Sequence, residues 1–111
     1  MTLTSLNQYG HDFQIKVISS LLTHKGFLIN IHDIISEEYF ENQAHRWTIK
    51  EILSYYDKYH TTPSLEVLKV ELQKVENEVL QIAIKEQLKD ANIASDDDLK
   101  YIQEEFTGFC K

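Results

Sequence analysis

One stretch of the sequence, residues 44–59, is apolar on two opposite sides when it is drawn as a helix. Ile49, Ile52, Leu53 and Tyr56 recur at the i, i+3, i+4 and i+7 spacing of one helical face. Ala44, Trp47 and Tyr55 fall on roughly the opposite face. A helix that is apolar on both sides is normally surrounded by other elements. We therefore expect residues 44–59 to form the central helix of an α-helical domain.

The scarcity of turn-forming residues agrees with a helical fold. The 111 residues include one proline and three glycines, which favours long helices over a many-stranded sheet. A hydrophobic fraction of 42% with 26% charged residues is ordinary for a globular chain of one domain. We predict an all-α fold, a compact bundle of about six helices.

Apolar residues at helical spacing indicate the other helices. They lie in residues 11–24, 27–35, 65–75, 79–91 and 99–109. Residues 27–35 would suit a strand equally well, and we favour a helix because no partner strand is evident. Pro63 disfavours helix at the residue before it, and Ser64 can cap a new helix. The polar residues 76–78 suggest a break, so residues 64–91 could be one helix or two.

The last predicted helix has a clear N-terminal capping signal and no C-terminal stop signal. Ser95 followed by three aspartates is a hydroxyl cap with carboxylates in the first turn. The apolar stripe then reaches Lys111 without a stop signal, so we expect a helix cut short, with more protein beyond it. The predicted parts are an N-terminal arm (1–10), a helical head (11–95) and the first helix of a truncated hairpin (96–111).

The stripes also predict which side chains are buried. Trp47 and the tyrosines could form a binding surface, but we interpret them as core packing. The core candidates are Phe13, Val17, Ile18, Leu21, Phe40, Trp47, Ile49, Ile52, Leu53, Tyr56, Leu68 and Leu72. We expect the last stripe to contact the missing hairpin helix or a neighbouring subunit, which gives the interface candidates Leu99, Ile102, Phe106 and Phe109.

The charge and the N-terminal sequence exclude several classes of protein. A net charge of −7, with scattered lysines and Arg46 as the one arginine, excludes a basic nucleic-acid-binding domain, although not a local basic patch. No signal peptide is visible, and no apolar run approaches the ~20 residues that span a bilayer. Cys110 is alone, so there is no internal disulfide framework. We expect a cytoplasmic protein that does not enter membranes.

No pattern of catalytic, cofactor-binding or metal-binding residues is present. The three glycines are isolated, so the Gly-x-x-x-x-Gly-Lys-Ser/Thr loop that cradles phosphates cannot form. The five histidines are spread without the spacing of a zinc site, and we interpret His45 as a helix-start residue with a satisfied ring. The three aspartates after Ser95 lack the other ligands of an EF-hand. Cys110 has no neighbouring base in sequence. We expect this chain to be no enzyme by itself and to bind no cofactor.

Four elements in order resemble the N-terminal domain of DnaB-like replicative DNA helicases. Residues 13–22 match the family's opening helix, "hxxxVhxxLL". Glu38-Tyr39-Phe40 matches an acidic-aromatic "D-F-Y" element, and His45-Arg46 with the stripe to Tyr56 matches "H-R-x-I-F-x-A-I-x-x-L-Y". Pro63-Ser64 with Leu68 and Leu72 matches "P-x-D-xxx-L-xxx-L", with Ser64 where many bacterial members carry Asp. The likeness covers a little over half the chain, is weaker from Glu76 onward and is greatest to helicases of T4-type phages.

The resemblance implies a role in a larger machine. The full-length protein would be a ring-shaped hexamer that unwinds DNA with ATP, and its motor domain, which binds ATP and Mg, would lie outside this chain. The N-terminal domains would self-associate into a collar and dock a primase or a helicase loader, without tight DNA binding of their own. Without the resemblance, the alternative is a free-standing small acidic all-α module for protein–protein contact, such as a phage or bacterial adaptor or regulator.

Overall fold

The structure is a computed structural model that describes residues 9–93 and 98–110. Its elements are α1 (His11–Thr23), α2 (Lys25–Ile31), the 3-10 turn η2 (Glu37–Tyr39), α3 (Gln43–Tyr59), α4 (Leu65–Leu72), α5 (Glu78–Ile93) and α6 (Leu99–Cys110). The described ranges contain six α-helices and no strand, so the prediction of an all-α bundle is confirmed. Of residues 27–35, which were expected to be helical, 27–31 lie in α2 and 32–35 follow its end.

Side-chain caps set where α3, α4 and α5 begin. The side chain of Asn42 accepts hydrogen bonds from the backbone N–H groups of the first turn of α3. Ser64 Oγ accepts from Val67 N–H at 3.3 Å, as its position after Pro63 predicted. Asn77 Oδ1 accepts from Leu80 N–H at 3.0 Å, which starts a new helix. Residues 64–91 therefore form two helices, whereas the predicted Ser95 cap lies outside the described residues.

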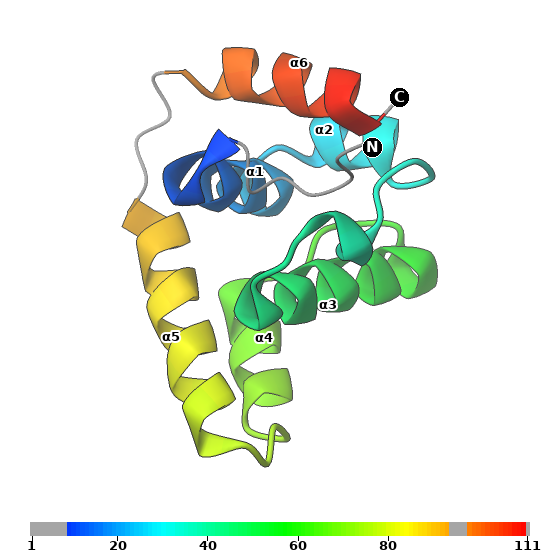
Figure 1. The fold of residues 1–111 in the computed structure, drawn as a ribbon. Coiled ribbons are helices and arrows are strands. Elements are labelled where there is room, and N and C mark those ends of the chain that lie inside the picture. The colour runs from blue at the N-terminus through cyan, green and yellow to red at the C-terminus, as the bar shows by residue number, and fades with distance from the viewer. Residues whose placement is uncertain (1–8, 94–97, 111) are drawn as a thin grey trace.

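The surrounded helix is α1, so the expectation that residues 44–59 form the central helix is wrong. Helix α1 packs against α2, α3, α5 and α6 (Figure 1). Its buried residues extend around the helix and include three polar ones, Gln14, Ser19 and Ser20. Helix α3 is buried mainly in its first half, and exposed residues from Asp57 to His60 end it. The two-sided pattern misled because Trp47 and Tyr55 are only half-buried, Trp47 at the edge of the smaller apolar cluster.

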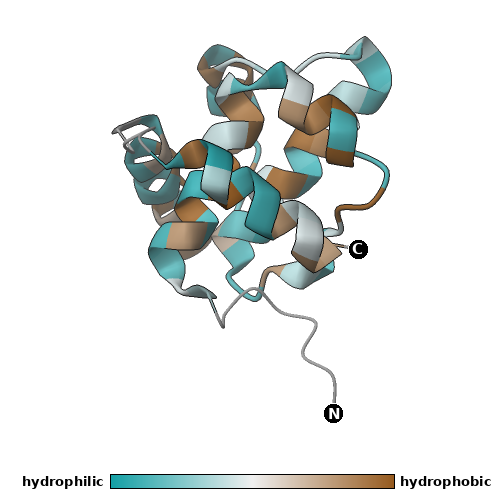
Figure 2. Ribbon diagram, turned by 90° about the horizontal axis from the view of Figure 1, so that it is seen from above, coloured by the Kyte–Doolittle hydropathy of each residue, from teal (hydrophilic) through white to brown (hydrophobic). Residues whose placement is uncertain are grey.

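Two apolar clusters hold the helices together. The larger one joins α1, α2, α3 and α6 around Phe40 and Phe106, both fully buried. The smaller one lies where α3 meets α4 and α5, and it consists of Ala44, Leu68, Leu72, Ile84 and Leu88. Figure 2 shows the matching pattern, in which brown apolar segments alternate with teal polar ones along the helices. Burying a large side chain such as Phe40 contributes about 2–3 kcal/mol relative to leaving it exposed.

Most predicted core residues are buried, and the others cover the edges. Those below 9% exposure are Val17, Ile18, Leu21, Phe40, Ile49, Ile52, Leu68 and Leu72. Phe13, Leu53 and Tyr56 are half-buried against the larger cluster, and Trp47 is half-buried against the smaller one. The core prediction therefore identified the right helix faces and overestimated the depth of four side chains.

Candidate functional site

His45 lies in the first turn of α3, as expected, and its ring is enclosed in the core. Only 1% of its surface is exposed, and its ring lies 5.3 Å from the His11 ring and 6.3 Å from the Phe40 ring, centroid to centroid. Gln14 Nε2 donates to the carbonyl oxygen of Gly10, which leaves Gln14 Oε1, 3.1 Å away, to accept from His45 Nδ1. Burial, together with the nearby His11, lowers the pKa of His45 to about 4, so the imidazole is neutral at pH 7.

The second nitrogen of the same ring, Nε2, has no hydrogen-bond partner among the described residues. The expectation of a fully satisfied His45 ring is therefore wrong for this atom. A basic nitrogen could act as a general base, but at 1% exposure it lies out of reach of any substrate in solution. Among residues 9–93 and 98–110, no group of three His, Cys, Asp or Glu side chains could hold a metal ion. His45 is thus a packing residue between α1 and α3.

A second buried polar link joins α3 to α5. Gln87 Nε2 donates to Thr48 Oγ1 at 2.9 Å, and Thr48 Oγ1 donates to the carbonyl oxygen of Ala44 at 3.1 Å. Gln87 is 3% exposed, so this hydrogen bond is shielded from water. Gln87 was not among the residues predicted from the sequence, although its place between Ile84 and Leu88, on the apolar side of the fifth helix, was a signal. The link fixes how α5 sits on α3, and thereby how α5 faces α4.

The stripe of α6 packs inside the chain. Leu99, Ile102 and Phe106 are at most 5% exposed, and α6 lies along α1 (Figure 1). Half-buried Phe109 has its ring 5.1 Å from the Tyr39 ring and 6.4 Å from the Phe106 ring, centroid to centroid. The stripe is apolar because it covers α1, so the structure gives these interface candidates an intramolecular contact in place of the expected one. Phe109 alone among the four retains substantial exposed surface.

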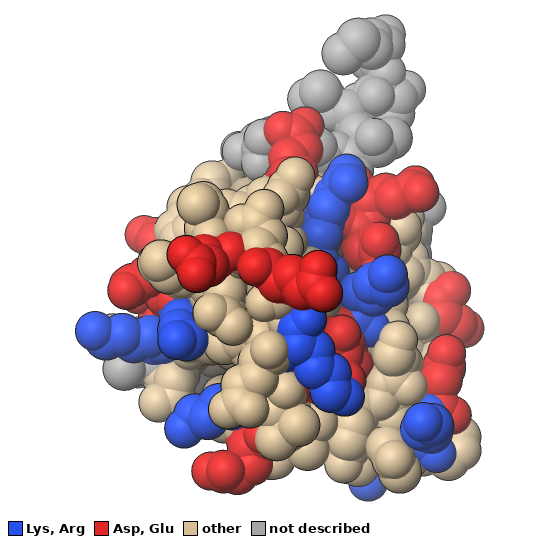
Figure 3. Space-filling model, turned by 90° about the horizontal axis from the view of Figure 1, so that it is seen from below, with Lys and Arg blue, Asp and Glu red and all other residues tan. Residues whose placement is uncertain are grey.

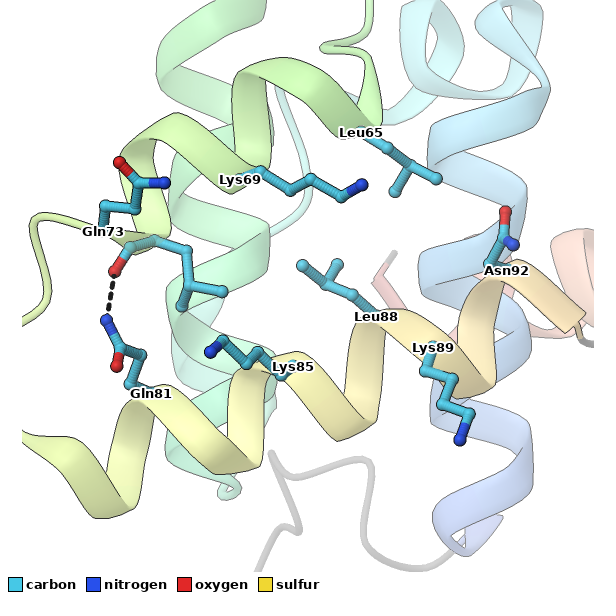
Figure 4. Close-up of a pocket in the computed structure, with 9 residues that line it drawn as sticks. Leu65, Lys69, Gln73, Gln81, Lys85, Leu88, Lys89 and Asn92 are labelled. Carbon is cyan, nitrogen blue, oxygen red and sulfur yellow. Dashed lines mark hydrogen bonds between the residues drawn. The ribbon is translucent and has the colours of Figure 1, made fainter.

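A groove of about 480 Å³ runs between α4 and α5 (Figure 4). Its residues combine an apolar base with a polar and cationic rim, and no carboxylate is among them. They are Leu65, Leu72 and Leu88; Gln73, Gln81 and Asn92; and Lys69, Lys85 and Lys89. Gln81 Nε2 donates to the carbonyl oxygen of Leu72 at 3.2 Å and closes one end of the groove.

The lysines give this groove a charge opposite to that of the whole chain. Lys69 and Lys85 point into the gap between the two helices, whereas Lys89 points away from it (Figure 4). The ion pairs of the described residues are Lys16–Asp98 and Lys74–Glu71, so none of the groove lysines is in one. The lysines are scattered along the sequence, and Lys69 and Lys85 line the same groove only because α4 and α5 pack side by side. On the face in Figure 3, basic and acidic side chains are interspersed.

A different surface lies between α3 and α4. The rings of Tyr55 and Tyr59 lie there with centroids 4.5 Å apart and planes inclined by 44°, beside Pro63. Its charges largely offset one another, because Lys74 Nζ pairs with Glu71 Oε2 at 2.7 Å. Burial raises the pKa of the nearby Glu51, and the Glu71 carboxylate raises it further. This surface is aromatic and mixed in charge, so it selects less clearly for one kind of ligand.

Comparison with known proteins identifies no relative. The sequence matches no protein-family model, no curated protein and no solved structure. In the described part of the chain, no helix is both long enough and apolar enough to cross a bilayer.

Proposed function

We propose that this chain is the N-terminal domain of a DnaB-like replicative DNA helicase of the T4-phage type, and that it serves assembly and docking rather than catalysis. The observation that carries the proposal is the order and spacing of four sequence elements. They correspond to α1, to the turn from η2 to Phe40, to α3 and to the Ser64-capped start of α4. A compact helical head with a polar, charged surface supports such a role.

In the proposed parent protein, these domains pair into a collar above a hexameric motor and offer a surface to primase or to a helicase loader. ATP and Mg bind the motor, in the cytoplasm, and this domain contributes contacts only. Helix α6 is then the start of a helical hairpin. Phe109, half-buried at the end of α6, is the residue of the predicted interface that can still contact a second helix.

A second candidate function is a free-standing acidic module for protein–protein contact, such as an adaptor or regulator. The packing of α6 favours it, since Leu99, Ile102 and Phe106 are buried within the chain and need no further helix to cover them. In that case the charged groove between α4 and α5 is the main binding surface, and no motor is attached.

Two measurements separate the candidates. If the reading frame continues past the codon for Lys111 into a phosphate-binding loop, the helicase assignment is supported, and a stop codon soon after Lys111 favours the adaptor. Isothermal titration of this chain with the primase encoded by the same genome is expected to give a saturable, enthalpically detectable complex. No binding to primase or to a loader from that genome would refute the docking role in replication.

A further inference from the structure

The groove between α4 and α5 combines an apolar base with positive charge. Its base is leucine from both helices, and two lysines point into it without a carboxylate partner. The chain as a whole carries a net charge of −7. A concentration of unpaired positive charge over apolar surface attracts a ligand that is itself anionic on its flanks and apolar on one side.

We propose that this groove binds an acidic amphipathic helix of a partner protein, which inserts leucine-type side chains between α4 and α5 and places carboxylates on Lys69 and Lys85. The proposal deepens the docking role above and rests on it, because it names the surface and the chemistry of the partner. Two parallel walls and a narrow apolar base suit one face of a helix, the helix-in-groove mode of recognition. The third lysine, Lys89, adds positive charge at the rim.

The composition of the groove favours a peptide over a nucleic acid. Single strands bind on aromatic side chains and along dense rows of basic residues, and strong phosphate contacts commonly use arginine. The groove contains neither an aromatic residue nor an arginine. A phosphate backbone would leave the exposed part of Leu65 uncovered, whereas a helix with apolar residues at i, i+3 and i+7 would cover it.

The exposed fractions of the three groove leucines support a partner helix that enters the groove from the solvent side. Leu65 is 37% exposed at one end, while Leu72 and Leu88 are 4% and 7% exposed deeper down. Helix α4 has 8 residues and α5 has 16, which at the usual rise gives walls about 12 Å and about 24 Å long. A partner helix therefore contacts both walls over about two turns. The Gln87–Thr48 hydrogen bond holds that wall on α3 independently of any ligand.

The probe is a fluorescein-labelled designed peptide of about 16 residues, helical, with leucines at i, i+3 and i+7 and glutamates beside them. Its anisotropy is followed with the full 111-residue chain at low and at physiological salt. We expect saturable binding that weakens with salt, and at least about tenfold weaker binding of a matched peptide with lysines in place of the glutamates.

Charge-reversal variants locate the site. Lys69→Glu/Lys85→Glu is expected to weaken binding of the acidic peptide at least about tenfold. Lys50→Glu/Lys100→Glu makes the same charge change on exposed positions of α3 and α6 and is expected to leave the affinity within about twofold. Leu65→Gln, at a partly exposed position, tests the apolar contact without removing a core side chain, and circular dichroism verifies that each variant is folded.

Three outcomes overturn the inference: no binding of the acidic peptide, equal weakening by the two double variants, or displacement of the peptide by an oligothymidylate. Binding to primase and to the loader tests the proposed function separately from the groove. If Lys69→Glu/Lys85→Glu still binds the primase from the same genome as tightly as the unaltered chain, the groove assignment fails and the docking role stands. If the peptide binds as expected while primase and loader do not, the groove stands and the helicase assignment fails.

Discussion

Gln14 and His45 meet in the interior of the molecule, with Gln14 Oε1 3.1 Å from His45 Nδ1 across 31 positions of sequence. The contact joins α1 to the first turn of α3, and the Asn42 cap fixes that turn. Because the Gln14 amide N–H donates to Gly10, its oxygen requires a donor, and the neutral imidazole supplies one. An imidazolium would also donate from Nδ1, so it is the burial of the ring, with His11 nearby, that makes the packing of α1 on α3 favour an uncharged His45.

This dependence predicts a loss of stability in mild acid. The pKa of His45 is lowered from 6.5 to about 4 in the folded chain, so the unfolded chain binds the proton first as the pH falls. The contribution is fully present above pH 6.5 and is lost as the pH falls toward about 4. We expect the free energy of unfolding in urea to be about 2 kcal/mol lower at about pH 5 than at about pH 7.

The variant His45→Gln provides the control, since it cannot titrate in this range. Its stability is expected to vary much less between the two pH values. Asp98, whose pKa the Lys16 ammonium lowers, loses its contribution only below its ordinary value of 3.8, and the raised pKa of Glu51 acts in the opposite direction. An unchanged pH dependence in His45→Gln would assign the acid effect to other groups.

The packing of α6 predicts unequal effects of two aromatic substitutions in that helix. Phe106→Ala empties a fully buried site and is expected to destabilise the chain by about 3–5 kcal/mol. Tyr101→Ala, at a residue 61% exposed, is expected to change the stability by less than about 0.5 kcal/mol. Urea unfolding followed by far-UV circular dichroism measures both. Equal, small effects would mean that α6 is not docked on α1 in solution.

The end of α3 predicts a stabilising change. His60 has φ 58° and ψ 32°, the left-handed conformation in which a β-carbon is strained, and it follows the last turn of α3. His60→Gly is expected to raise the free energy of unfolding by about 0.5–1 kcal/mol. His60→Ala removes the same imidazole and its edge contact with Tyr56 but keeps the β-carbon, so it should give no gain. A gain in the alanine variant as large as in the glycine variant would exclude backbone strain as the cause.

The proposed function predicts that the isolated chain neither hydrolyses ATP nor binds DNA tightly. A net charge of −7 repels a phosphate backbone, and the groove lysines form only a small local patch. Filter binding with single-stranded and duplex DNA at physiological salt is expected to give no sub-micromolar complex. A tight complex, or phosphate release from ATP above that of a buffer blank, would contradict the assignment.

Local sequence patterns were enough to find the helices because each depends on neighbouring residues. The apolar spacing located all six helical runs, and Pro63-Ser64 placed the start of α4. The polar residues 76–78 left the choice between one helix and two open, and Asn77 resolved it as a cap. Eight predicted core residues proved buried for the same reason, since the apolar face of a helix is set by its own period.

The candidate site depended on pairs of residues that no local pattern connects. Lys69 and Lys85 come from different helices, and their shared groove exists only because Gln87 and its apolar neighbours place α5 beside α4. The apolar stripe of α6, expected to form an interface, packs on α1 for a related reason. The hydrophobic effect is non-directional, so an apolar helix face packs against whichever apolar face the fold brings next to it.

The sequence by itself determined the helical class, the approximate position of each helix and the side of each that avoids water. The tertiary structure decided that α1 rather than α3 is surrounded, that His45 is neutral and enclosed, and that Lys69 and Lys85 share a groove. The division has one physical origin. Backbone hydrogen bonds and caps act over a few residues. Burial depends on how the apolar faces of all the helices pack together, which no short stretch of sequence specifies.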